Sequence, residues 1–386
     1  MKRTLSTVSL GEVTTVFSGF AFKSSGFNTE SKGLPLIRIR DIVRGYTDTF
    51  FEGNYDEDFI VENGDILIGM DGEFNRARWG GGTSLLNQRV CKVAGDEKKL
   101  DNDYLFHFLP ITLKKIEDRT PFVTVKHLSV KDLKAVQIPL PPLGEQKRIA
   151  AILDKADALR RKRRQALALL DSLTQSIFLE MFGASDAAGW PSLNIGEVAK
   201  DIRTGPFGSQ LLHSEFVEEG IAVLGIDNAV SNRFEWGKAR FITEEKYRTL
   251  KRYTVKPGDV LITIMGTCGR CAVVPEGITT AVNTKHICCI TLDQKRVLPQ
   301  YLHACFLNNR SVLKQLGVQA KGAVMPGLNM GIIRSLIIPI PPLQLQERFR
   351  DAVAAVESQI NVSGRAMSDD SSLFASLQHR AFTGQL

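Results

Sequence analysis

Apolar residues along this chain follow two different spacings, and the two alternate. Short apolar or alternating runs bounded by glycines fill the first part of each half, as at Leu36–Ile39, Asp65–Ile68 and Asp259–Ile264. Such runs are typical of short strands joined by long loops. Each of these regions ends at a Pro-Pro pair, after which apolar or long side chains recur in steps of three and four, as in an amphipathic helix. The pattern therefore predicts an α+β fold with two β-rich domains, each followed by a long helix.

The helical stretches keep their spacing for about four heptads, which is typical of a coiled-coil seam. Because proline fits the first turn of a helix but not its interior, each helix is expected to begin directly after its Pro-Pro pair. About 40 residues of helix measure about 60 Å. Each helix on its own would fit a globular core, but two at equivalent places favour antiparallel packing on each other around a pseudo-twofold axis. The predicted seam is Ile149, Ile152, Ala156, Leu159, Arg163, Ala166, Leu170, Leu173 and Ile177 in the first helix, and Phe349, Val353, Val356, Ile360, Ser363, Met367, Asp370, Phe374 and Leu377 in the second.

The second half of the chain repeats the first. The hexapeptide Ile138–Leu143 returns as Ile338–Leu343, so the residue numbers differ by 200. Before the two Pro-Pro pairs, Gly64–Ile68 matches Gly258–Ile262. A period of this length is too long for a solenoid repeat of about 20–50 residues, so it indicates a duplicated domain with an appended helix. The expected organisation is a first domain over residues 1–140, a central helix over 141–183, a second domain over 184–340 and a distal helix over 341–386.

Composition places the chain among ordinary globular proteins. Of its 386 residues, 43% are hydrophobic and 24% charged, and 49 Lys and Arg against 42 Asp and Glu leave a net charge of +7. That balance mildly favours a polyanionic partner. No run approaches the roughly 18 apolar residues of a spanning helix, and the N-terminus lacks a signal-peptide pattern, so we expect no membrane and a cytoplasmic location. The six cysteines are expected to be scattered buried thiols.

Catalytic and cofactor motifs are missing from the sequence. There is no phosphate-binding loop, and neither Pro-Pro pair has the neighbours of an amino-methyltransferase motif. Glu244–Lys246 and Asp96–Lys98 match the end of a nuclease metal site without further ligands, and Cys268 with Cys271 makes only half a zinc site. His127 follows Lys126 in a loop, where a surface histidine is favoured over a ligand contact. We therefore expect no catalytic residue, no metal and no cofactor on this chain.

Basic and amide side chains gather beside glycines in both domains, and Arg76 and Arg270 occupy the same alignment position. Arg, Asn and Gln form bidentate hydrogen bonds with base edges, while Lys and loop amides suit phosphates. A solvated charged surface is the alternative for any single residue, but the repetition favours DNA. The candidate contacts are Lys23, Arg38, Arg40, Asn75, Arg76, Arg78, Asn87, Gln88, Arg89 and Lys126 in the first domain, and Ser209, Asn228, Arg270, Asn283, Lys285 and Lys321 in the second.

A run of five basic residues, Arg160–Arg164, falls in the middle of the first helix. Three roles remain open for it. The run can follow DNA phosphates, bind an acidic partner protein, or pair with Glu357 and the Asp369–Asp370 pair of the second helix.

These features together resemble the specificity subunit of type I restriction-modification systems. The resemblance covers essentially the whole chain and rests on the duplicated Pro-Pro and helix regions, and on Gly258–Ile262 followed by Gly266 and Arg270. These last residues look like the core of that family's target recognition domains. The first copy departs from this core, because Asp71–Phe74 stands where the second has Met265–Cys268.

The resemblance implies a non-catalytic reader of double-stranded DNA. Each domain would recognise one half of a split target, and the helices would set the gap between the halves. Two modification subunits that use S-adenosylmethionine would dock on the chain, and restriction subunits would supply the ATP- and Mg²⁺-dependent steps. The dissimilar domains predict an asymmetric target. The alternatives are a scaffold or decoy of the same fold without DNA specificity, or a stand-alone methyltransferase or nuclease.

Overall fold

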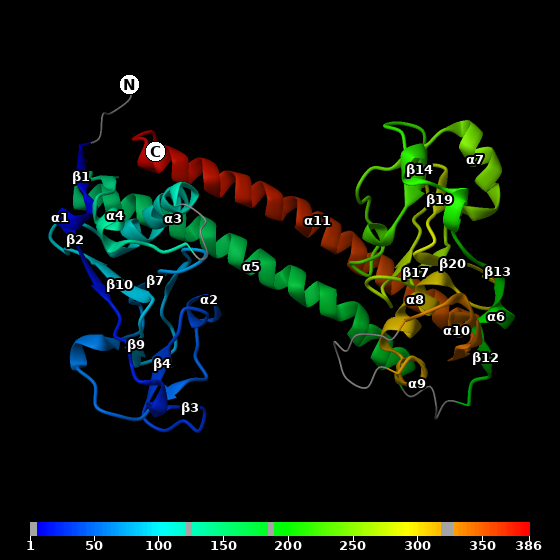
Figure 1. Ribbon diagram of the computed structural model, residues 1–386, viewed down its shortest axis with the longest axis horizontal. Coiled ribbons are helices and arrows are strands. Elements are labelled where there is room, and N and C mark those ends of the chain that lie inside the picture. Colours follow the sequence, from blue (N-terminus) through cyan, green and yellow to red (C-terminus); the bar gives the residue numbers. More distant parts are fainter. Residues whose placement is uncertain (1–5, 121–125, 184–188, 318–326) are drawn as a thin grey trace. The chain divides into compact units, whose positions relative to one another are not determined.

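The computed structural model of the chain describes residues 6–120, 126–183, 189–317 and 327–386. It comprises two compact units (Figure 1). Unit 1 consists of Met1–Arg164 and Arg365–Leu386, and unit 2 of Gln165–Gly364. Each unit thus combines one β-rich region with part of both long helices, and each is described below by itself.

Unit 1 is built on two sheets. The first has four antiparallel strands in the order β2-β10-β7-β8, and the second orders β3-β5-β4-β9-β6 with β4 and β9 parallel. β1 pairs with β11 beside them. The strands are β1 (Thr7–Ser9), β2 (Thr14–Ser18), β3 (Phe27–Asn28), β4 (Leu34–Ile37), β5 (Phe50–Phe51), β6 (Ile60–Val61), β7 (Ile66–Gly69), β8 (Arg76–Arg78), β9 (Ser84–Leu86), β10 (Val90–Gly95) and β11 (Gln137–Pro139).

Unit 2 repeats this topology. Its antiparallel sheet runs β13-β20-β17-β18, its mixed sheet runs β15-β14-β19-β16 with β14 and β19 parallel, and β12 pairs with β21. The repeat in sequence is therefore a repeat in strand order, except that β3 has no counterpart among the described strands of the mixed sheet of unit 2. The strands are β12 (Ser192–Asn194), β13 (Ala199–Thr204), β14 (Ile221–Leu224), β15 (Phe241–Ile242), β16 (Thr254–Val255), β17 (Val260–Thr263), β18 (Cys271–Val273), β19 (Ala281–Asn283), β20 (Ile287–Leu292) and β21 (Ile337–Pro339).

Polar caps set the starts of several helices, as side-chain oxygens satisfy N–H groups that have no partner in the first turn. Asp101 accepts from the N–H groups of Asp103 and Tyr104 at α3, and Asn329 accepts from that of Ile332 at α10. The helices are α1 (Leu10–Val13), α2 (Asp41–Arg44), α3 (Asn102–Arg119), α4 (Val130–Lys134), α5 (Leu143–Phe182), α6 (Ile195–Val198), α7 (Glu244–Leu250), α8 (Pro299–Asn308), α9 (Arg310–Gln315), α10 (Met330–Ser335) and α11 (Leu343–Phe382).

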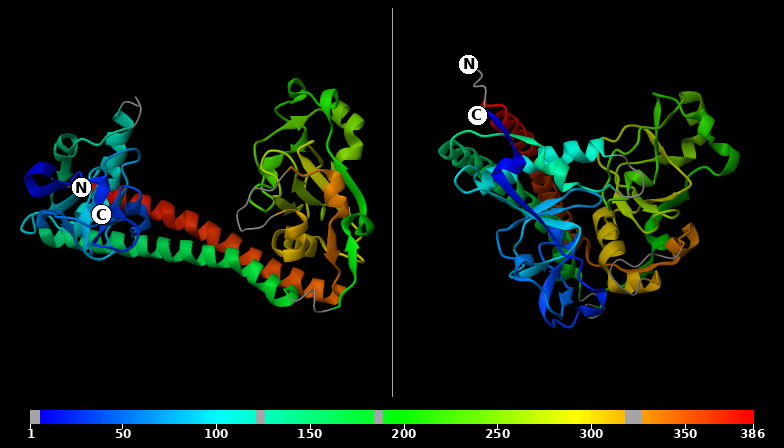
Figure 2. Two further views of the ribbon diagram at one scale, coloured as in Figure 1. Left: turned by 60° about the horizontal axis from the view of Figure 1, so that its bottom comes forward. Right: turned by 60° about the vertical axis from the view of Figure 1, so that its left-hand side comes forward.

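The long helices α5 and α11 lie side by side in each unit (Figures 1 and 2). In unit 1 the Arg163 Nε donates to Asp370 Oδ2 at 2.6 Å, and in unit 2 the Phe182 and Phe349 ring centres are 5.4 Å apart. Residue numbers thus rise along α5 while they fall along α11. Both helices begin one residue after a Pro-Pro pair and span 40 residues each. The expected pair of long antiparallel helices is confirmed.

The seam of α11 agrees with the prediction, and that of α5 agrees at Ile149 and Arg163 but is wrong at Leu159, Ala166 and Leu173, which are exposed. Leu159 and Leu173, predicted inside, are 45% and 41% exposed, while Leu153 and Phe178 are fully buried. A straight helix has 3.6 residues per turn, so its inward face drifts away from a strict heptad of period 3.5. The alternating steps of three and four followed the heptad and so placed Leu159 and Leu173 on the seam, although the inward face has drifted away from them.

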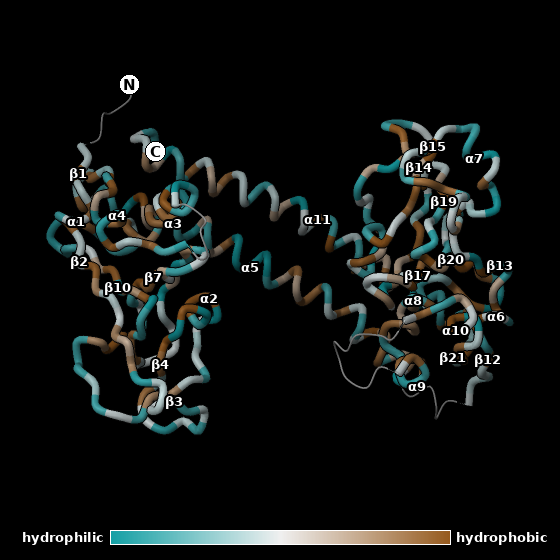
Figure 3. Tube along the Cα trace, in the orientation of Figure 1, coloured by the Kyte–Doolittle hydropathy of each residue, from teal (hydrophilic) through white to brown (hydrophobic). Residues whose placement is uncertain are grey.

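A buried glutamine joins each long helix to its β-rich region. Gln146 accepts from the N–H of Asp101 at 2.9 Å, and Gln346 accepts from that of Leu298 at 2.9 Å. Each also donates to the carbonyl of the first proline of the Pro-Pro pair. Both side chains are fully buried, so every one of these polar atoms needs its partner. The apolar core around these junctions appears as brown segments in Figure 3, for example along α3 in unit 1.

Candidate nucleic-acid interface

One edge of unit 1 brings together loops that are distant in sequence, here called the loop edge. It comprises Gly19–Lys23 after β2, Asp71–Asn75 between β7 and β8, Asn87–Arg89 between β9 and β10, and Lys126–His127. Backbone hydrogen bonds join these segments: Gln88 N donates to Phe20 O, Met70 N to Arg89 O and Gly72 N to Lys126 O, at 2.8, 2.8 and 2.9 Å. The edge therefore assembles six predicted contacts, which are Lys23, Asn75, Asn87, Gln88, Arg89 and Lys126.

An exposed arginine of this edge pairs with an acid. Arg89 Nη1 lies 3.1 Å from Asp71 Oδ2, and the side chains are 64% and 15% exposed. The other oxygen of Asp71 is 2.6 Å from Nδ1 of His127. Sequence reasoning named Arg89 but not Asp71, although the acid stood out as the departure from the second copy.

Unit 2 builds the same edge from different side chains. Its Ile264 N donates to His286 O at 2.9 Å, which matches the bond from Met70 to Arg89 in unit 1. His286 therefore stands where unit 1 has Arg89, and the exposed Met265 stands where unit 1 has Asp71. Burial lowers the pKa of His286, as does the nearby charge of Lys285. Among the predicted contacts, Ser209, Arg270 and Lys285 are exposed here.

Three predicted asparagine contacts are buried and belong to the scaffold of these loops. Asn228 accepts from Gly225 N and donates to Glu235 O, and Asn283 donates to Ile287 O. Asn87, the counterpart of Asn283, is also buried. In both copies a glycine packs on this asparagine, because a Cβ on Gly19 or Gly205 would lie 2.1 Å from its carbonyl oxygen. Burial argues against direct base contact by these amides, and no base-contacting role is assigned to them.

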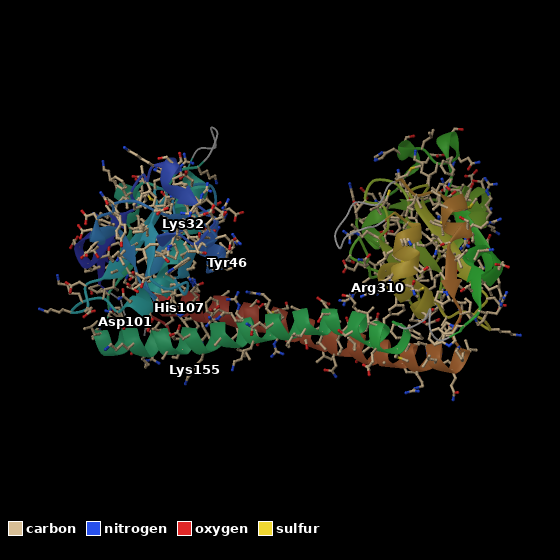
Figure 4. All side chains as sticks on the ribbon, turned by 90° about the horizontal axis from the view of Figure 1, so that it is seen from below. Lys32, Tyr46, Asp101, His107, Lys155 and Arg310 are labelled. Carbon is tan, nitrogen blue, oxygen red and sulfur yellow. The ribbon has the colours of Figure 1, made fainter. Side chains whose placement is uncertain are left out.

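Arg76 and Arg78 point to α3 rather than to the loop edge. Their guanidinium groups lie 3.5 and 4.4 Å from the centre of the Phe106 ring, and Arg78 pairs with Asp103. Burial lowers the pKa of Arg76 to about 10. The neighbouring His107 lies against α5 (Figure 4), where its Nε2 is 2.8 Å from Asp154.

Three further predicted contacts interact with other residues of unit 1, and a fourth lies outside the residues that the structure describes. Arg38 donates its backbone N–H to Asp41, and Arg40 lies 3.7 Å from the same carboxylate. Lys126 donates to the carbonyl of Glu117 at 2.8 Å, which turns its ammonium back toward α3. Lys321 lies outside the described residues.

One of the three roles proposed for the basic run of α5, pairing with acidic residues of α11, is present in the structure. Arg163 pairs with Asp370 of α11, and the Arg160 guanidinium lies 4.4 Å from the Phe374 ring centre. Arg161, Lys162 and Arg164 are exposed, so contacts with phosphates or an acidic protein stay predictions for them.

The described residues offer little that suggests metal or thiol chemistry. No group of three His, Cys, Asp or Glu side chains within them is arranged to hold a metal ion. All six cysteines are free, and five are buried. Burial raises the pKa of the Cys91, Cys288 and Cys305 thiols to about 12, so they remain protonated. Each described helix is too short or too polar to cross a membrane.

Comparison with known proteins agrees with this architecture. The family model described as "Type I restriction modification DNA specificity domain" matches residues 2–169 and 189–363. The type I restriction enzyme EcoBI specificity subunit of Escherichia coli is 30% identical over 98% of this chain and 85% of its own length. The MjaVIII specificity subunit of Methanocaldococcus jannaschii is 22% identical over 86% and 81%.

Solved structures agree in fold. The S subunit of a type I restriction-modification system from M. genitalium superposes with a TM-score of 0.61 at 14% identity, covering 99% of this chain and 97% of that one. A chain from a study of type I complex assembly has a TM-score of 0.57 at 17% identity, covering all of both chains. The repeated fold, the two family matches along the chain and the relatives that span it together show that the protein belongs to the type I restriction-modification specificity subunit family.

Proposed function

We propose that this chain is the DNA-reading subunit of a type I restriction-modification complex, with one half of a bipartite target bound by each unit. The observation that carries the proposal is the duplicated loop edge. The two copies share backbone hydrogen bonds but carry different side chains at the equivalent positions, Arg89 beside Asp71 in unit 1 and His286 beside the exposed Met265 in unit 2. Charged and apolar groups contact different base edges, so the two half-sites should differ.

The long helices set the gap between the half-sites in this proposal. About 60 Å of helix corresponds to between one and two turns of duplex DNA, each about 34–36 Å. Large apolar side chains also remain exposed on both helices, namely Leu159 and Leu373 in unit 1 and Leu169 and Val362 in unit 2. Exposed apolar groups on helices that already share a seam favour docking of further helices. We assign these positions to two modification subunits, one on each unit.

Catalysis belongs to the partners in this proposal. The modification subunits would bind S-adenosylmethionine, and restriction subunits would use ATP and Mg²⁺, so the chain itself would carry no cofactor and act in the cytoplasm. The exposed part of the basic run, Arg161, Lys162 and Arg164, would contribute contacts with phosphates between the half-sites.

The test is reconstitution of the chain with the modification subunit encoded beside it, followed by binding and methylation mapping. We expect salt-dependent, sequence-selective binding and methylation of a split, asymmetric site. Sequence-independent binding would support the scaffold or decoy alternative. A palindromic site would contradict the assignment of different half-sites to the two units. Methylation or cleavage by the chain alone, with S-adenosylmethionine or Mg²⁺, would support an enzyme instead.

A further inference from the structure

The backbone of Arg89 adopts a conformation that an arginine rarely occupies. Its φ is 68°, in the left-handed region, where only Ser31 and Asn232 join it among the described residues other than glycine. The left-handed region is sterically unfavourable for side chains with a Cβ, and Asn tolerates it better than most. Gly or Asn would therefore suit this turn better than Arg. A strained residue that the surrounding fold holds in place points to a use for its side chain.

The fold holds Arg89 from both its backbone and its side chain. The carbonyl oxygen of Arg89 accepts from Met70 N at 2.8 Å, and Val90 N closes the turn on Asn87 O at 3.3 Å. The guanidinium is 3.1 Å from Asp71 through Nη1. An exposed ion pair adds little stability, so it offers poor compensation for backbone strain. Fold stability alone thus gives no reason for an arginine at this position.

Asp71 is in turn kept in place by its surroundings. One of its oxygens faces Arg89 and the other faces Nδ1 of His127, while Gly72 turns the chain directly after it with φ of 73°. The carboxylate is mostly buried, so the ion pair through Nη1 limits where the guanidinium can lie. With Nη1 toward Asp71, the remaining donors of Arg89 stay available on its exposed side. A guanidinium restrained by a neighbouring acid loses less entropy when it forms a bidentate contact.

We propose that Arg89 reads a guanine in the major groove of the half-site bound by unit 1, with Asp71 as its positioning residue. The inference rests on the proposed function and assigns one base to one side chain. A guanidinium donates two parallel hydrogen bonds to O6 and N7 of guanine, the commonest specific contact between a protein and DNA. A phosphate contact would need charge but not an orienting carboxylate, whose own charge would repel the DNA backbone.

Unit 2 lacks this arrangement at the equivalent place. His286 and the exposed Met265 replace the arginine and its acid, so the guanine reading is confined to unit 1. Substitution at Arg89 should therefore affect one half-site and leave the other unchanged.

The test compares Arg89→Ala, Arg89→Lys and Asp71→Asn in the reconstituted complex with modification subunits. We expect Arg89→Ala and Arg89→Lys to lose about tenfold or more in discrimination at one guanine of one half-site, because lysine keeps the charge but not the fork. Asp71→Asn should lower discrimination at the same guanine and nowhere else. Lys114→Ala, which removes an equally exposed cation from an ion pair of unit 1, is the matched control and should leave discrimination unchanged.

Arg89→Gly separates a reading role from a structural one. Glycine relieves the left-handed strain, so the thermal midpoint of this variant should not fall below that of the wild type while its selectivity is lost. Uniform weakening on all sequences, with a salt slope smaller by about one, would identify a phosphate contact and overturn the proposal. Unchanged discrimination would overturn it as well. A wild-type complex without any sequence preference would instead overturn the proposed function.

Discussion

The same Gly-Asp motif precedes β7 in unit 1 and β17 in unit 2, but the two carboxylates have different surroundings. In unit 2, Asp259 is 1% exposed and accepts from Arg203 Nη2 at 2.6 Å and from Thr291 Oγ1 at 2.6 Å. Arg203 is itself only 9% exposed. In unit 1, Asp65 is partly exposed and lies 3.4 Å from Lys92 Nζ. One sequence motif therefore supports a buried ion pair in one unit and a half-exposed pair in the other.

Replacement of each aspartate by asparagine should separate these two environments. Asp259→Asn leaves the Arg203 charge buried, with Asp201 at 2.8 Å as its remaining carboxylate, and we expect a loss of about 3 kcal/mol in unfolding free energy. Asp65→Asn is expected to cost at most about 1 kcal/mol, because water still solvates Lys92. Asparagine keeps an oxygen for the backbone N–H that each aspartate binds, so the comparison isolates the charge.

Urea unfolding followed by tryptophan fluorescence measures both losses. Trp79 reports on unit 1, and Trp190, which packs against Phe182, reports on unit 2, so single-tryptophan variants assign each transition to its unit. Urea is preferable to guanidinium chloride because it does not screen ion pairs. Combining Asp259→Asn with Arg203→Met should recover part of the loss, since both charges are then removed. Equal losses for the two aspartates, or a loss below about 1 kcal/mol for Asp259→Asn, would refute the reasoning.

Three further predictions concern the helices and the titration of unit 2. Inserting one heptad into both α5 and α11 adds about 10 Å, so methylation mapping should show a gap longer by about three base pairs with unchanged half-sites; an altered half-site would contradict the spacer role. Gln346→Ala should cost about 1–3 kcal/mol in urea unfolding because it strands the buried N–H of Leu298, whereas the exposed control Gln344→Ala should be close to neutral. Burial lowers the pKa of His303, whose Nε2 donates to two backbone carbonyls. The neutral histidine therefore contributes fully to the unfolding free energy above about pH 6.5, and this contribution falls as the pH drops. His303→Gln should flatten the pH dependence of the unfolding free energy, and an unchanged slope of that free energy against pH would count against the prediction.

Sequence reasoning succeeded where a residue's role follows from chain direction and spacing. The Pro-Pro pairs located both helix starts, because proline excludes a helix interior whatever the tertiary context. The seam of α11 was also predictable, since large apolar residues such as Phe349 and Val353 recur at the spacing of one helix face. On α5, Leu159 and Leu153 are equally apolar, but Leu153 is buried in the core of unit 1 and Leu159 is exposed, a difference that depends on tertiary packing.

The loop edge was less accessible to sequence reasoning, for a physical reason. Arg, Asn and Lys beside glycines were recognised by type, but type does not reveal exposure. Asn87 and Asn283 are buried because a glycine backbone packs directly on them, a contact between segments about 70 residues apart in the chain. Asp71 became recognisable only once folding placed it against Arg89.

The way the loop edge is built explains how two units of one fold can read different sequences. The turn that presents Arg89 in unit 1 and His286 in unit 2 is held by a hydrogen bond between backbone atoms, from Met70 and Ile264 respectively. Because this hydrogen bond uses only backbone atoms, almost any side chain is compatible with it at the residue that supplies the carbonyl. Buried groups carry the fold in both copies, so exposed positions can change from an oriented arginine to a histidine beside methionine without altering the scaffold. In the proposed function, a change of target base therefore requires substitutions at the edge alone, and the core, the caps and the helix junctions can stay as they are.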